Sequence, residues 1–159
     1  MKMKLLGVVY MFAALHVAAQ VDPVDKKGLA IGGYDVVAYF LPGKAVKGIE
    51  GNASTFDGVT YLFSSVENKK VFEGNPEMFL PQYEGYCALA VSYGKKISID
   101  PHTFKIVDNK LYLFYNGNAS GRKVNSLETW NRNEPHLLKK ADALWPDVKK
   151  KKYKDSDSI

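Results

Sequence analysis

The chain has 159 residues, 46% of them hydrophobic and 25% charged, so its composition is that of an ordinary globular protein and excludes a disordered or fibrous chain. The formal net charge is +5, and much of the excess lies in the lysine-rich run at residues 149–154, so the folded part shows no basic face for nucleic acid. The single cysteine, Cys87, excludes an intramolecular disulfide.

Residues 1–20 have the features of a secretory signal peptide. A start with two lysines is followed by an apolar run and then by small residues. The apolar run is interrupted by His16 and is shorter than the roughly 20 residues that a spanning helix needs. We therefore predict an exported protein, periplasmic or secreted, that is cleaved after Ala19 or Gln20 and has no membrane span. A membrane anchor is the alternative.

The first predicted element is a short helix within residues 33–44. The Asp35 carboxylate is placed to accept the free amide hydrogens of its first turn, and Pro42 and Gly43 end it. A β-hairpin is predicted within residues 53–65, where two runs of β-branched and aromatic residues flank an Asp-Gly turn at positions 57–58.

Ser64 and Ser65 are good caps for a following helix over residues 66–75. The segment that holds Cys87, residues 83–94, reads as a helix that Gly94 closes. A second hairpin is predicted within residues 103–116, with its turn at positions 108–109.

The C-terminal part predicts two short helices within residues 121–145, separated near Glu134-Pro135 and stopped by Pro146. No repeat or linker divides the chain. We predict one α+β domain over residues 21–146, built from short antiparallel hairpins and several short helices, and a basic, disordered tail over residues 147–159.

Cys87 is open to two interpretations. In a helix, it would share a face with small apolar residues, and free cysteine is commonly a buried small hydrophobe. Gly85 and Tyr86 place it near the start of that helix, where unpaired amide hydrogens stabilise a thiolate. The first interpretation predicts a structural residue and the second a reactive or metal-binding thiol.

The other candidates are two histidines and a group of tyrosines. His102 follows a proline in a turn, and His136 lies beside the apolar stripe of the last helix. A zinc site needs about four Cys or His ligands in tight spacing, and the sequence contains no such group. A softer ion such as Cu(I) can use Cys87 with a histidine if the fold brings them together. The residues that we expect to line a ligand pocket are Tyr34, Asp35, Tyr61, Tyr83 and Tyr86. The alternative is that the tyrosines pack and bond their hydroxyls to the backbone, and that Asp35 serves only as a helix cap.

Several stretches in order resemble the exported bacterial YHS-domain proteins. They include 31-IGGYDVVAYF-40, 61-YLFSSVEN-68, 75-NPEMFLPQYEGYCALAV-91 and 111-LYLFYN-116, and the resemblance runs from about Gly28 to Pro146. It implies a small metal-binding module related to heavy-metal trafficking domains, with copper as the implied metal. The shorter YHS modules carry additional cysteines near the position of Ser64 and Ser65, and this chain departs from them there.

The resemblance also implies that the position of Cys87 is functional, because some similar proteins carry selenocysteine there. The first hypothesis is therefore an exported binding or carrier module, in which Cys87 binds copper, another transition metal or a small ligand, with His102 or His136 as partners. Thiol redox chemistry at Cys87 is the second hypothesis. A structural or interaction domain with Cys87 in the core is the third. No complete catalytic constellation is present, which favours a binding module over an enzyme.

Overall fold

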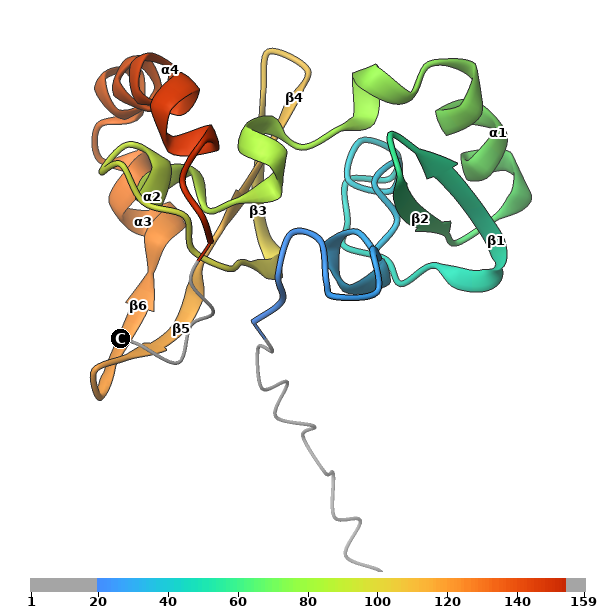
Figure 1. Ribbon diagram of the computed structural model, residues 1–159, viewed down its shortest axis with the longest axis horizontal. Coiled ribbons are helices and arrows are strands. Elements are labelled where there is room, and N and C mark those ends of the chain that lie inside the picture. The colour runs from blue at the N-terminus through green and yellow to red at the C-terminus, as the bar shows by residue number, and fades with distance from the viewer. Residues whose placement is uncertain (1–19, 154–159) are drawn as a thin grey trace, which may run out of the picture.

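The computed structural model describes residues 20–153. The predicted signal peptide up to residue 19 and residues 154–159 of the predicted tail lie outside the described residues. Antiparallel hairpins alternate with short helices (Figure 1), which confirms the predicted α+β class. No helix of the described part is long and apolar enough to cross a membrane.

Three hairpins form three separate two-stranded antiparallel sheets. The strands are β1 (Ile49–Phe56), β2 (Val59–Phe63), β3 (Asp100–Val107), β4 (Lys110–Phe114), β5 (Asn116–Ala119) and β6 (Arg122–Asn125). The first hairpin turns at Asp57-Gly58 and the second at Asp108-Asn109, as predicted. All four turn residues have positive φ angles, which Gly, Asn and Asp tolerate better than other residues. The β5–β6 hairpin was not predicted.

The helices are short except for the last one. They are α1 (Val66–Gly74), α2 (Ala88–Val91), α3 (Ser126–Asn131) and α4 (Glu134–Lys149), with 3-10 turns η1 (Ile31–Gly33), η2 (Pro76–Phe79) and η3 (Gln82–Gly85). Ser65 caps α1 as predicted, since its hydroxyl accepts the Asn68 amide at 3.0 Å. The prediction that Pro146 stops the last helix is wrong. The helix continues to Lys149, past the predicted domain end, because Val148 is buried in the core.

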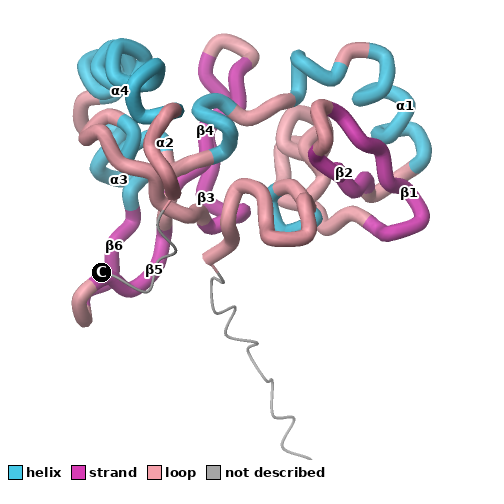
Figure 2. Tube along the Cα trace, in the orientation of Figure 1, coloured by secondary structure: helices cyan, strands magenta, loops and turns pink. Residues whose placement is uncertain are grey.

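Two predicted helices are replaced by turns. Residues 36–42 form consecutive turns and no helix (Figure 2), although Asp35 does accept the amides of Val37 and Ala38 as predicted. Proline disfavours helical geometry in the residue before it, so the first turn cannot propagate. Within residues 83–94 only α2 is helical, because Tyr83 and Glu84 have left-handed φ angles of 56° and 53°.

β4 contributes side chains to two hydrophobic core clusters. Leu111 and Leu113 join a first core cluster, which also contains residues of the β1–β2 hairpin and α1. Tyr112 and Phe114 join a second cluster, which contains Trp130 and residues of α4. Successive side chains of a strand point to opposite faces, so one strand contributes to both cores. Figure 1 shows the β3–β4 hairpin between the α1 side and the α4 side.

Candidate functional site

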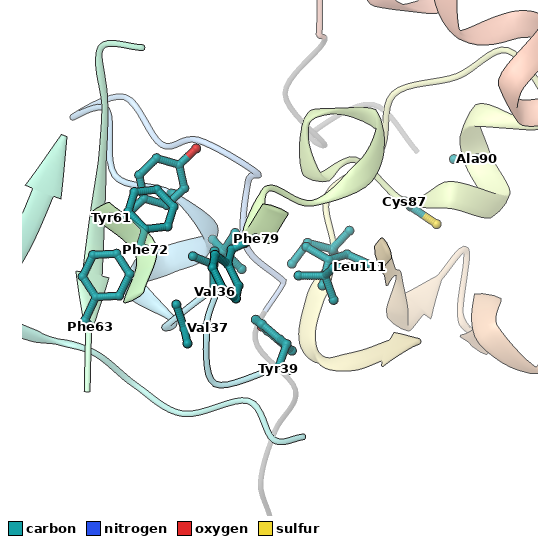
Figure 3. Close-up of a cluster of buried hydrophobic side chains, with 14 residues drawn as sticks. Val36, Val37, Tyr39, Tyr61, Phe63, Phe72, Phe79, Cys87, Ala90 and Leu111 are labelled. Carbon is teal, nitrogen blue, oxygen red and sulfur yellow. The ribbon is translucent and has the colours of Figure 1, made fainter. Parts of the chain in front are cut away.

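Cys87 lies where η3 leads into α2. It is the residue just before α2, and its amide donates to the Ile97 carbonyl at 3.1 Å. Its side chain is 1% exposed and belongs to the first core cluster. Figure 3 shows the Cys87 sulfur directed away from Leu111 and the large aromatic side chains of that cluster. The thiol is therefore buried, with its sulfur turned away from the large side chains of that cluster.

Hydrogen-bond donors lie near the Cys87 sulfur. The Tyr115 backbone amide lies 3.4 Å from it. Burial raises the pKa of the Cys87 thiol, and hydrogen bonds from the Ala90 and Tyr115 amides and the Ser126 side chain offset part of that rise. The net direction is upward, so the thiol is protonated at neutral pH and is a weak nucleophile in the resting protein.

A pocket of about 270 Å³ opens beside Cys87, between α2, the segment that follows it and the β5–β6 hairpin. We call it the Cys87 pocket; its lining residues are Cys87, Leu89, Ala90, Tyr93, Lys95, Ile97, Tyr115, Ala119, Val124 and Ser126. Most of these are apolar, and Lys95 is the one charged residue among them. Such a pocket suits a small apolar molecule, at the lower end of the size range of ligand sites.

The predicted metal partners of Cys87 have other neighbours. His102 lies in β3, and its Nε2 is 3.1 Å from the Tyr34 hydroxyl. His136 is exposed near the start of α4. Neither lines the Cys87 pocket. Within residues 20–153, no three His, Cys, Asp or Glu side chains gather where they could hold a metal ion.

Two of the predicted pocket residues share a second pocket. Tyr61 and Tyr86 both line a pocket of about 520 Å³ on the side of the molecule that carries the β1–β2 turn. Tyr34 does not line it and pairs with His102 instead. Tyr83 donates a 2.7 Å hydrogen bond to Asp142 of α4, within the second core cluster.

The fifth predicted pocket residue, Asp35, is fully buried, and protein groups surround its carboxylate. Its Oδ2 accepts hydrogen bonds from the Ser64 amide at 2.8 Å, the Ser64 hydroxyl at 2.7 Å and the Asn68 side-chain amide at 2.7 Å. Together with the contacts to Val37 and Ala38, these bonds tie three segments of the chain to one carboxylate. Asp35 lines neither pocket described above.

The lining residues that the sequence analysis missed come mostly from β5, β6 and their flanks. Tyr115, Ala119, Val124 and Ser126 lie in the unpredicted β5–β6 hairpin or directly beside it. A turn signal was present at Ser120-Gly121, but the strands beside it lack the alternation that indicates a strand.

Profiles of known protein families give no match to this chain, and searches of curated proteins and of solved structures give none either.

Proposed function

We propose that this chain is a binding module for a small, mainly apolar ligand that lies in the Cys87 pocket against the protonated Cys87 thiol. The single observation that carries the proposal is the 270 Å³ pocket with Cys87 in its lining. An apolar ligand gains free energy by leaving water for such a lining, and the exposed Lys95 suits a ligand with an anionic group at the pocket edge.

The raised pKa of Cys87 supports binding over the alternative of thiol redox chemistry. Redox cycling begins with a thiolate, and burial keeps this thiol protonated. Copper binding, which the resemblance to YHS-domain proteins implies, stays a prediction, and Cu(I) is included in the test below.

Disulfide trapping tests the proposal. The protein is equilibrated with small disulfide fragments that carry either a phenyl or cyclohexyl group or a polyhydroxyl group, and adducts at Cys87 are counted by intact-protein mass. We expect apolar fragments to be captured about tenfold more than polar ones, since burial of a phenyl-sized surface contributes about 1.5 kcal/mol. Stoichiometric protection by anaerobic Cu(I) would favour a metal site instead.

Two valine variants make the control. Val124 lines the Cys87 pocket, so V124W fills it and should abolish the preference for apolar fragments. Val66 is exposed on α1 and lines neither pocket, so V66W should leave capture unchanged. Equal capture of polar and apolar fragments by the wild type would contradict the proposal.

We also propose that the protein is exported, on the basis of the charged, apolar and small-residue pattern of residues 1–20. Expression of the full chain in a bacterial host, followed by fractionation and mass measurement, tests this. The expected product lies outside the cytoplasm and begins at Gln20 or Val21, and an uncleaved cytoplasmic product would contradict it.

A further inference from the structure

A second pocket, of about 520 Å³, lies apart from the Cys87 pocket and shares no lining residue with it. We call it the Tyr61 pocket; its lining residues are Pro23, Val24, Ala30, Ile31, Phe56, Asp57, Val59, Tyr61, Leu80, Pro81, Glu84, Tyr86 and Lys149. The walls are mostly aliphatic, proline and aromatic. The pocket therefore offers a large apolar surface, with polar groups at a few points.

The Tyr61 hydroxyl is a polar group in the lining of this pocket. The side chain is 8% exposed, and among residues 20–153 its hydroxyl has no hydrogen-bond partner. Figure 3 shows the hydroxyl at the end of the ring that points away from Phe63. The hydroxyl is not sealed from solvent, so it is free to bond a ligand that enters the pocket.

The Tyr61 hydroxyl is a hydrogen-bond donor at neutral pH. Burial, with a smaller contribution from the nearby Asp57 carboxylate, raises the pKa of Tyr61 to about 12. The hydroxyl therefore keeps its proton, and a ligand acceptor in the pocket can take a hydrogen bond from it.

The charges around the pocket disfavour an anion. Lys149 is the only basic lining residue, and it is paired with Glu84 at 3.0 Å. Asp57 adds a second acid without a second base in the lining. A ligand with a negative charge would meet excess negative charge here, whereas a neutral ligand would not.

Two residues of the lining have an uncommon backbone conformation. Ile31 and Glu84 both line it and have left-handed φ angles of 47° and 53°. A β-branched residue such as Ile31 rarely adopts this conformation. Both turns contribute a residue to the lining.

We infer that the Tyr61 pocket is a second ligand site, which takes a neutral, mainly apolar small molecule whose hydrogen-bond acceptor bonds the Tyr61 hydroxyl. The inference is independent of the function proposed for the Cys87 pocket, because the two linings have no residue in common. No covalent step is involved.

Titration of the full chain with prodan tests the inference. Prodan is a neutral naphthalene fluorophore whose ketone is a hydrogen-bond acceptor and whose emission moves to shorter wavelength when that bond is lost. We expect saturable binding by the wild type. In Y61F the dissociation constant should rise about five- to tenfold, with bluer emission of the bound dye, since one hydrogen bond is removed and the ring is kept.

Two further variants separate the pockets. Val24 lines the Tyr61 pocket and is 41% exposed, so V24W should block it without disturbing the core and should abolish binding, even if Y61F fails to fold. V124W, which fills the Cys87 pocket, should leave prodan binding unchanged. The inference is overturned if the wild type binds no prodan, if folded Y61F binds as tightly as the wild type, or if V124W removes binding while V24W keeps it.

Discussion

At the scale of single residues, Asp35 is a buried carboxylate whose hydrogen bonds connect three segments of the chain. Its Oδ1 accepts backbone amides at the start of a turn, as expected of a capping residue. The bonds from Ser64 and Asn68 could not be predicted, because they join residues about thirty positions apart and depend on the tertiary fold.

Replacement of Asp35 should destabilise the fold strongly. D35A leaves several buried donors without an acceptor, so we expect the free energy of unfolding to fall by about 3 kcal/mol or more. Urea unfolding followed by tyrosine and tryptophan fluorescence measures it. D57N is the matched control, since Asp57 is exposed and Asn tolerates its turn conformation, and its effect should stay within about 0.5 kcal/mol. Equal effects of the two variants would contradict the role of Asp35.

Buried tyrosines should make the protein less stable in alkali. Burial is the main cause that raises the pKa values of Tyr61 and Tyr112 from 10.0 to about 12. Between these values the unfolded chain loses protons that the folded chain keeps, so the free energy of unfolding should fall as pH rises from about 10 to about 12. Below pH 10 this contribution is complete. Urea unfolding across this range should show a shallower fall in Y61F/Y112F, and an identical fall would contradict the assignment.

At the scale of secondary-structure elements, the features that the sequence predicted correctly are those that depend on neighbouring residues alone. The two Asp-Gly and Asp-Asn turns and the Ser65 cap were predicted because each depends on neighbouring residues. The β5–β6 hairpin was missed because β5 consists of Asn, Gly and Ala, which favour strands weakly. Since that hairpin closes the Cys87 pocket, the sequence could single out Cys87 as the only thiol but not the pocket around it.

The segment before Cys87 shows the opposite case, in which tertiary packing overrides a helical pattern. Tyr83, Glu84 and Gly85 all have positive φ angles. The Tyr83 hydroxyl bond to Asp142 and the Glu84 ion pair with Lys149 both connect this turn to α4. These long-range contacts stabilise a conformation that the local sequence does not favour.

G85A should test this turn. Gly85 has a φ of +83°, and an added Cβ would lie 3.1 Å from the Pro23 Cβ. We expect a loss of about 2 kcal/mol in the free energy of unfolding, because a left-handed residue with a side chain is strained. Gly51 is the control, since its φ is not positive and a Cβ there would meet nothing within 4 Å. A thermal shift in G85A no larger than in G51A would show that the turn tolerates a side chain.

At the scale of the whole molecule, β4 contributes to two cores, and the segment around Cys87 also contributes to both. Cys87 belongs to the first core cluster and its neighbour Ala88 to the second. The α+β class and the single domain could be predicted from the alternation of hairpins and helices. The two pockets could not, since each is lined by segments far apart in sequence.

The function proposed for this chain requires that the Cys87 pocket gives a small ligand access to the thiol in the folded protein. The most direct measurement is the rate at which methyl methanethiosulfonate modifies Cys87 across low urea concentrations, compared with global unfolding under the same conditions. We expect a rate that is first order in reagent and nearly independent of urea below the unfolding transition, because access through the pocket needs no global unfolding. A rate that rises with urea as steeply as global unfolding, and gives the same free energy, would mean that Cys87 is sealed in the core, and would contradict the claim.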